Sequence, residues 1–265
     1  MTPLRKPASG PEVRQLQTRL KERGFDPGQI DGVFGAGTEA AVLAFQRSED
    51  LLADGVAGAR TLAKLGLADT DRLASAIPGV SVAVVAEMFP STPLANIKAH
   101  LPPVLNALSA GNLADKPMVL MALATIRAET EGFVPISEGR SRYNTSPQGH
   151  PFDLYDNRRD LGNQGRPDGA QFCGRGFVQL TGRANYAKYG RAIGLGDQLI
   201  TTPDLANDPD IAAKLLTAFL AGHERALKQA LLDDNLALAR RLVNGGSHGL
   251  AQFTAAYRTG ERLLA

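Results

Sequence analysis

The sequence between residues 172 and 186 reads Phe-Cys-Gly-Arg-Gly-Phe-Val-Gln-Leu-Thr-Gly-Arg-Ala-Asn-Tyr, and it says more about the fold and its site than any other stretch. Polar side chains stand here among glycines and apolar residues, a mixture that is unusual in a plain core segment. They are Arg175, Gln179, Thr181 and Asn185. Two carboxylates, Glu129 and Glu138, lie upstream. A pair of carboxylates and a polar strip flanked by glycines predict a site that cleaves sugar chains.

Helical patterns dominate the sequence on both sides of this stretch. Residues 116–129 are almost continuously apolar after a proline that suits a first helical turn, so this helix must be buried on most sides. Further helices are predicted at 82–89, 97–108, 184–192, 209–232 and 236–242, and again after Gly249. The best strand candidate is the short segment Gly176–Leu180. The predicted fold class is therefore mainly α.

The segment 132–169 is rich in glycine, proline, asparagine and aspartate and shows little periodicity. A loop of this length inside a domain is uncommon and is usually functional. We therefore expect residues 132–169, which include Glu138, to form a long active-site loop before the 172–186 stretch.

The first seventy residues contain a repeat. Asp31-Gly-Val-Phe-Gly-Ala-Gly-Thr38 recurs in shortened form as Asp54-Gly-Val-Ala-Gly-Ala-Arg-Thr61. Each copy predicts a glycine turn followed by a threonine that caps the next helix. The result is a compact bundle of three short helices, with a second and larger helical domain after it. The predicted core of the bundle consists of Val13, Leu16, Leu20, Phe25, Val42, Phe45 and Leu62.

The bundle resembles the peptidoglycan-binding domain type 1. The matching patterns are Val13-x-x-Leu-Gln-x-x-Leu20, Gly24-Phe25, Asp31-Gly-x-Phe-Gly-x-x-Thr38 and Ala41-Val-x-x-Phe-Gln46. The resemblance implies that residues 1–68 anchor the protein to the bacterial cell wall without catalysis. Read without it, the same residues simply build a helical bundle. Residues 69–81 are predicted to be a linker to the second domain, residues 82–265.

The second domain resembles glycoside hydrolase family 19, which includes plant-type chitinases and many phage endolysins. The shared block is Gly174-Arg-Gly-x-x-Gln-Leu-Thr181, and the resemblance covers roughly the last two-thirds of the chain. It implies an α-helical, lysozyme-like catalytic domain. Together with the N-terminal bundle, this is the arrangement of a modular phage-type endolysin.

Glu129 is the candidate general acid. It ends the buried helix 116–129, where loss of hydration favours the protonated carboxyl group that a general acid needs. The family resemblance supports this role, because Ala128-Glu129-Thr130-Glu131-Gly132-Phe133 matches the segment that carries the acid. Glu131 would point to nearly the opposite side of a helix and fits less well. An exposed charge at a helix end is the alternative reading of Glu129.

Glu138 is the candidate general base, nine residues after Glu129. This role comes from the resemblance to phage-type members, because spacing alone allows almost any separation of the two side chains. A base that activates water on the far face of the sugar makes the reaction inverting, with the carboxyls roughly 6.5–9.5 Å apart. A solvated loop glutamate is the alternative.

The resemblance also supplies the other site residues. Thr181 would position the attacking water and Asn185 would hold substrate, while Gln179 and Tyr186 could line the cleft. Asn244, in Val-Asn-Gly-Gly, matches a late element expected to bind substrate. The same residues have structural readings, with Thr181 as a helix cap and Tyr186 as core. Arg175 is a further candidate for the substrate-binding set, with a structural alternative in which it anchors the acidic loop by ion pairing.

The chain departs from the family at one place. Related sequences carry an Asp-Arg pair shortly after the Asn-Gly-Gly element, whereas this chain has Gln252-Phe253. An arginine that would pair with a carboxylate of the site is therefore missing, and we expect the electrostatics of the base to differ.

Composition excludes several other classes. The net charge of +2 is too small to indicate a nucleic-acid partner, and no apolar run is long enough to span a membrane. Cys173 is the only cysteine, so an internal disulfide is impossible, and the four histidines lie too far apart for a metal site. We expect no metal, no cofactor and a monomer.

These observations predict an endolysin-type muramidase that hydrolyses the glycan strands of bacterial peptidoglycan by an inverting acid/base mechanism. A chitinase of the same family, a lytic transglycosylase and a non-catalytic wall-binding protein remain as alternatives. The first residues lack the apolar core of a signal peptide. The expected route is synthesis in the host cytoplasm, release through a holin-type pore and action on the wall in the periplasm.

Overall fold

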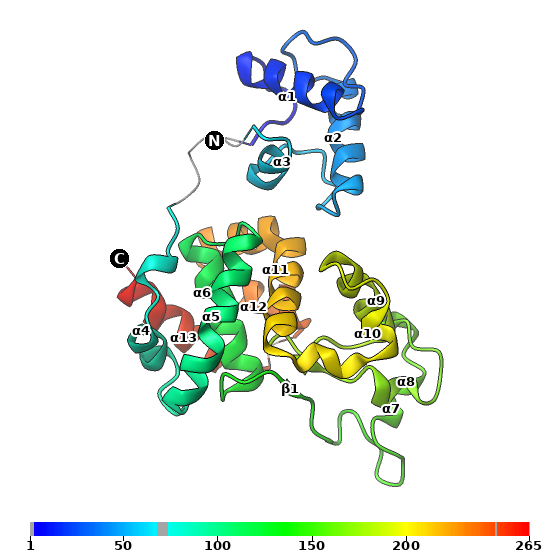
Figure 1. Cartoon of the computed structure of the whole chain (residues 1–265), viewed down its shortest axis with the longest axis vertical. Helices are drawn as coiled ribbons and strands as arrows, with labels where there is room; N and C mark the ends of the chain where they lie inside the picture. Colours follow the sequence, from blue (N-terminus) through cyan, green and yellow to red (C-terminus); the bar gives the residue numbers. More distant parts are fainter. Residues whose placement is uncertain (1–2, 68–73, 247, 265) are drawn as a thin grey trace. The chain divides into compact units, whose positions relative to one another are not determined.

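The computed structural model describes residues 3–67, 74–246 and 248–264 and divides the chain into two compact units, Met1–Ser75 and Ala76–Ala265. Each unit has a buried apolar core of its own. Helices predominate over strands in the described part of both units (Figure 1), which confirms the predicted mainly α class.

The N-terminal unit contains three helices, as predicted: α1 (Pro11–Glu22), α2 (Ala36–Ser48) and α3 (Ala59–Lys64). Its predicted core is confirmed, with Phe25 only partly buried and packed edge-on against the Phe45 ring. Two isolated bridges, Leu4 with Ala57 and Ser9 with Val33, tie the loops to each other.

A buried glutamine organises each copy of the repeat. Gln17 of α1 is 1% exposed, and its Nε2 donates to Asp31 Oδ1 at 2.9 Å and to Thr38 Oγ1 at 3.0 Å. Its Oε1 accepts from the backbone N–H of Gly32 at 2.8 Å. The side chain of Gln17 therefore holds the whole turn between α1 and α2.

Gln46 of α2 repeats this arrangement in the second copy. Its Nε2 donates to Asp54 Oδ1 at 3.0 Å and to Thr61 Oγ1 at 3.1 Å, and its Oε1 accepts from the Gly55 N–H at 3.0 Å. The predicted threonine caps are wrong, because α2 and α3 begin two residues before Thr38 and Thr61. Each threonine lies in the first turn, where it accepts a hydrogen bond from its glutamine.

In the described residues, the second unit consists of short and long helices and a small two-stranded antiparallel sheet. Its first half contains η1 (Ile77–Gly79), α4 (Val82–Met88), α5 (Leu94–Ala110), α6 (Lys116–Thr130), β1 (Ile136–Ser137), α7 (Asp153–Asp156), η2 (Arg159–Leu161), α8 (Asp168–Gln171) and β2 (Arg175–Gly176). Its second half contains α9 (Arg183–Ala192), α10 (Gln198–Thr201), η3 (Pro203–Asn207), α11 (Pro209–Leu232), α12 (Leu236–Asn244) and α13 (Leu250–Leu263).

Helix α6 forms the centre of this unit. Every residue from Met118 to Ile126 is buried, as its apolar sequence predicts. Helices α4, α11 and α13 pack against it, and α5 lies beside α11 (Figure 1). Because α6 is fixed on all sides, its last turn holds Glu129 in a rigid setting. None of the helices in the described part of the chain is long and apolar enough to cross a membrane.

The two-stranded sheet of β1 and β2 differs from the strand that the sequence predicted. The strand expected at Gly176–Leu180 is a turn, because the N–H of Leu180 donates back to the Arg175 carbonyl at 2.9 Å and Gln179 has a φ of 51°. Only Arg175 and Gly176 form a strand, which pairs antiparallel with Ser137 and Ile136. The loop predicted over 132–169 contains only β1, α7, η2 and the start of α8.

The predicted linker 69–81 is too long. Residues 69–73 lie outside the described residues, whereas residues 76–81 belong to the second unit. The N–H of Ala76 donates to the Ala114 carbonyl at 2.8 Å, and Val80 is buried in the core of that unit. Within it, Ile77–Gly79 forms the short helix η1.

Candidate active site

The backbone of Glu138 extends the hydrogen bonding between β1 and β2 by one residue. Its N–H donates to the Gly174 carbonyl at 2.7 Å, directly beyond the pairing of Ser137 with Arg175. The pairing of β1 with β2 therefore brings the 172–186 stretch next to Glu138. The exposure of Glu138 is intermediate, so its carboxylate is reachable from solvent.

The carboxylate of Glu138 accepts three hydrogen bonds. Asn144 Nδ2 and the Tyr155 hydroxyl donate to Oε1 at 2.8 and 2.9 Å, and the Gly174 N–H donates to Oε2 at 3.1 Å. Donors from three separate segments fix both oxygens. A carboxylate held in this way keeps a defined direction, which a general base needs to activate one water molecule.

Asn144 and Tyr155 were missed by the sequence reasoning. Both lie in the long loop, where Asn144 is fully buried although its side chain is polar. Burial, and then the charge of Glu138, raise the pKa of Tyr155, so its phenol stays protonated and donates at any physiological pH. The loop signal was present in the sequence, but nothing in it singled out these two residues.

Glu129 lies in the last turn of α6 and pairs with an arginine. Arg240 Nη1 of α12 is 2.7 Å from Glu129 Oε1, outside hydrogen-bond geometry, so the contact is an ion pair. The Arg240 side chain is completely buried and that of Glu129 is 13% exposed. The alternative of an exposed helix-end charge is therefore wrong for Glu129.

Arg240 also connects Glu129 to the segment of Asn244. Arg240 Nε and Asn244 Nδ2 both donate to the carbonyl of His248, at 3.0 and 3.1 Å. Gly249 follows so close to α6 that an added Cβ would lie 3.0 Å from the Ala128 carbonyl oxygen. The Asn-Gly-Gly element thus lies beside the end of α6, where Glu129 stands.

Gln179, Thr181 and Asn185 form a connected polar strip. Gln179 Nε2 donates to the Ile136 carbonyl at 2.9 Å, Thr181 Oγ1 to the Gln179 carbonyl at 2.9 Å, and Asn185 Nδ2 to the Thr181 carbonyl at 2.7 Å. Among the described residues, these three side chains make no hydrogen bond with either carboxylate. Each is partly exposed, and their roles toward substrate remain predictions.

Tyr186 does not line a cleft. Its ring is fully buried, its hydroxyl donates to the Cys173 carbonyl at 2.7 Å, and Arg175 Nη1 donates to it at 3.0 Å. Burial raises the pKa of this phenol. The cleft-lining prediction for Tyr186 is corrected, and its alternative reading as core is the one that holds.

Arg175 is also structural rather than substrate-binding. It is 8% exposed, and its Nε pairs with Asp204 of η3 at 2.9 Å, while Nη1 donates to the Gln171 carbonyl at 2.9 Å. These contacts hold β2 against η3 and α8. The ion pair is with Asp204 and not with an acidic residue of the long loop, so that part of the alternative is also corrected.

Cys173 is a free and buried thiol. Burial raises its pKa, which disfavours the thiolate that a nucleophile would need. In the described part of the chain, no group of three or more His, Cys, Asp or Glu side chains could hold a metal ion.

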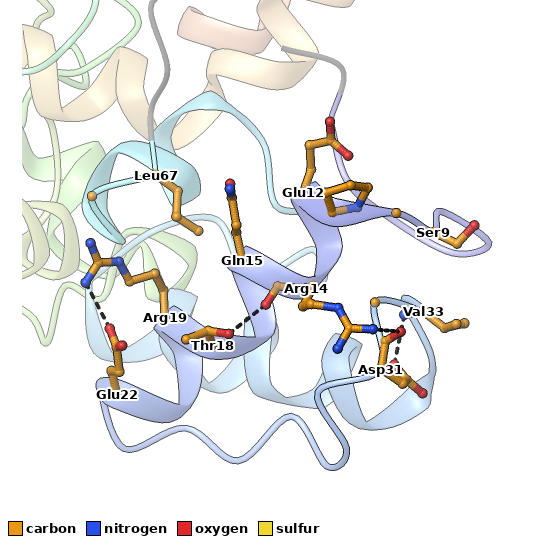
Figure 2. Close-up of a pocket in the computed structure, with 14 residues that line it drawn as sticks. Ser9, Glu12, Arg14, Gln15, Thr18, Arg19, Glu22, Asp31, Val33 and Leu67 are labelled. Carbon is orange, nitrogen blue, oxygen red and sulfur yellow. Dashed lines mark hydrogen bonds and ion pairs between the residues drawn. The ribbon is translucent and has the colours of Figure 1, made fainter.

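The N-terminal unit has an open groove of about 1430 Å³ along α1 (Figure 2). Its lining includes Gln15, Thr18 and Arg19 of α1, the Asp31 turn and the half-exposed side chain of Val33. Arg14 is fixed at one edge, because Nη1 and Nη2 donate to the carbonyls of Ile30 and Asp31 at 2.9 and 3.0 Å. The groove offers polar groups together with the apolar residues Pro11, Val33 and Leu67.

Comparison with known proteins gives a family match within the N-terminal unit. Residues 9–65 match the family model described as "Putative peptidoglycan binding domain". The chain is 54% identical over 54 residues to a spore cortex-lytic enzyme of Bacillus cereus, a match that covers 20% of this chain and 21% of the relative.

The match to a second relative is longer than the N-terminal unit. A glycosyl hydrolase family 19 domain-containing protein of Haemophilus influenzae is 27% identical over 117 residues, 44% of this chain and 54% of the relative. The chain therefore spans about a fifth of the length of the spore cortex-lytic enzyme and about half of the length of the family 19 domain-containing protein. Among solved structures, chitinase C of Streptomyces griseus aligns with 70% of this chain and 75% of its own, at 20% identity and a TM-score of 0.46.

Proposed function

We propose that this protein is a muramidase of the endolysin type, which hydrolyses the glycan strands of bacterial peptidoglycan. The observation that carries the proposal is the pair of carboxyls: Glu129 is held by Arg240 at the end of a buried helix, and Glu138 is held by three donors. The domain match over residues 9–65 favours peptidoglycan as the polymer. The match to a family 19 domain protein favours glycosidic-bond cleavage.

In the proposed reaction, Glu129 takes part in its protonated form and donates this proton to the glycosidic oxygen while the bond from the anomeric carbon to that oxygen breaks. Glu138 takes a proton from a water molecule that attacks the anomeric carbon from the opposite face. The product has inverted configuration, and both carboxyls return to their starting state by proton exchange with solvent. We propose that Thr181 positions this water and that Gln179, Asn185 and Asn244 contact the sugar chain.

The products of digestion test this reaction. Purified sacculi should release fragments with new reducing ends on N-acetylmuramic acid, detected by borohydride reduction and mass spectrometry. New reducing ends on N-acetylglucosamine would indicate a glucosaminidase, and anhydro-muramic ends would indicate a lytic transglycosylase, which needs only the acid. Glu129→Gln and Glu138→Gln should each abolish release. Near-normal release by Glu138→Gln would exclude the inverting mechanism.

A chitinase is the second candidate. The chain is 47% identical over 45 residues to an acidic 26 kDa endochitinase of Solanum lycopersicum. A chitinase would use the same two carboxyls on a chain of N-acetylglucosamine. Hydrolysis of chitin oligomers at a rate equal to or above that of sacculi would favour it over the muramidase.

We propose that the groove on α1 is the wall-contacting surface of the N-terminal unit. Its support is the domain match and the position of the groove on the first copy of the repeat. The double variant Arg14→Ala/Val33→Asp should lower the fraction of protein that sediments with sacculi. Arg47→Ala is the matched control, because Arg47 is exposed on α2 and does not line the groove. Equal sedimentation of both variants would place the wall contact elsewhere.

We further propose that the enzyme reaches the wall through a holin-type pore during lysis by a phage. Peptidoglycan lies outside the cytoplasmic membrane, so a protein made in the cytoplasm must cross that membrane to act. Expression in a Gram-negative host should cause lysis only when a holin is produced with it. Lysis without a holin would show another route of export.

A further inference from the structure

Among the residues that the structure describes, Arg240 is the largest side chain that is completely buried. It lies on the inner face of α12, whose neighbouring buried residues Leu236, Ala239 and Val243 are apolar. Moving a guanidinium into such surroundings costs several kcal/mol unless charge and hydrogen bonds compensate. A purely structural helix would place an aliphatic residue at this position.

The compensation comes from the candidate active site. Nη1 of Arg240 lies 2.7 Å from Oε1 of Glu129, and Nε donates to the His248 carbonyl at 3.0 Å. That carbonyl also accepts from Asn244 Nδ2 at 3.1 Å. A single buried side chain therefore joins the candidate acid to the segment that carries a candidate substrate contact.

Residue 253, where related sequences carry an arginine, contributes no charge to the site. Phe253 of α13 is fully buried, and its ring stacks on Tyr257 at 6.3 Å between centroids. The positive charge beside Glu129 comes from Arg240 of α12.

We propose that Arg240 is the positioning residue of Glu129. This inference rests on the proposed function. With Oε1 paired to Arg240, Oε2 is the oxygen that would donate its proton to the glycosidic oxygen. As the proton moves from Glu129 to the leaving oxygen, Glu129 becomes a carboxylate, and the adjacent guanidinium stabilises that developing charge.

Steady-state hydrolysis of dye-labelled sacculi by the full chain tests this role. Arg240→Met should lower kcat roughly 100-fold and change KM less than about threefold, because the contact acts on the reacting group. Arg240→Lys should recover part of kcat, since it restores a positive charge. Arg241→Met is the matched control, because Arg241 is the next residue on α12 but is exposed, and it should keep wild-type kcat.

Thermal melting provides a readout that does not depend on activity. Glu129→Gln and Arg240→Met should each lower the melting temperature, and the double variant should lose less than the sum of the two. Additive losses would show that the pair is not coupled. If Arg240→Met does not fold, Arg240→Lys and Arg240→Gln carry the same kinetic comparison.

The outcomes separate this inference from the proposed function. Wild-type kcat in Arg240→Met, or a loss that Arg240→Lys does not reduce, would overturn the positioning role while Glu129→Gln still abolishes cleavage. No cleavage of sacculi by the wild-type protein would instead reject the proposed function. In that case the melting data alone decide whether the pair is coupled.

Discussion

The hydroxyl of Tyr155 donates a 2.9 Å hydrogen bond to Oε1 of Glu138, across the long loop that separates the two residues in sequence. Removing this donor by Tyr155→Phe should lower kcat on sacculi about tenfold, because a hydrogen bond to a charged group contributes roughly 1.5 kcal/mol. Dye release from labelled sacculi measures the change.

Tyr143→Phe is the control for that variant. Tyr143 lies in the same loop, is 72% exposed and makes no contact with Glu138 among the described interactions. It should keep wild-type activity. A tenfold loss in both variants, or in neither, would contradict the role of the Tyr155 hydroxyl.

The sequence predicted the fold better than the site, and the reason is physical. Helix periodicity is a local property, so α6, α9 and α11 appear in the structure within a residue or two of their predicted bounds. The contacts of Glu129 and Glu138 join segments far apart in the chain. Arg240 and Tyr155 look like ordinary helix and loop residues in sequence, and only the packing of the segments brings them to the carboxylates.

The errors have the same origin. Tyr186 was assigned to the cleft because its motif lies near the site, but on α9 its ring is buried in the core. Thr38 was taken as a helix cap from its local context, whereas a glutamine one helix earlier determines its hydrogen bond. Local patterns predict elements, and they do not predict which side chain a neighbouring element will contact.

Gln17 and Gln46 should be the most sensitive polar positions of the N-terminal unit. Gln17→Ala leaves the Gly32 N–H and three acceptors without their partner in a buried setting, which should destabilise this unit by roughly 2 kcal/mol. Hydrogen–deuterium exchange of the α1 and α2 amides in the full chain measures the loss. Gln15→Ala, on the exposed face of α1, should leave exchange unchanged, and faster exchange in both variants would show a non-specific effect.

The ion pair of Asp168 with Arg183 makes part of the stability of the second unit depend on pH. The Arg183 guanidinium donates to both oxygens of Asp168, at 2.7 and 2.5 Å, and lowers the pKa of this carboxyl below its usual 3.8. Because the folded pKa is the lower one, this contribution is complete above the unfolded value and is lost as the pH falls through the folded value.

Arg183→Leu tests this dependence. At pH 7 it should destabilise the protein by roughly 2 kcal/mol, since the Asp168 side chain is only 3% exposed and would lose its counter-ion. Melting curves from pH 7 to pH 2 should show the difference from wild type shrinking below pH 3.8. A difference that stays constant over this range would exclude the carboxyl as its source.

Gly174 should be required for the direction of the Glu138 carboxylate. A Cβ added to Gly174 would lie 2.8 Å from Gln179 Oε1, 3.2 Å from Glu138 Oε2 and 3.3 Å from Glu138 Cβ, so Gly174→Ala must displace one of these side chains. The Gly174 N–H also donates to Glu138 Oε2, and a shift of the carboxylate would weaken that bond. We expect a fall in kcat of about tenfold, because small misplacements of a catalytic group are costly.

Gly139→Ala provides the matched comparison for Gly174→Ala. Gly139 also neighbours Glu138, but a Cβ there would meet nothing within 4 Å. Both variants should melt near the wild-type temperature, since neither glycine has a left-handed φ that an alanine would strain. If Gly174→Ala keeps full kcat, the carboxylate tolerates displacement and the hydrogen bonds around Glu138 do not set the rate. If Gly139→Ala loses as much, the effect comes from the loop backbone and not from the crowding at Glu138.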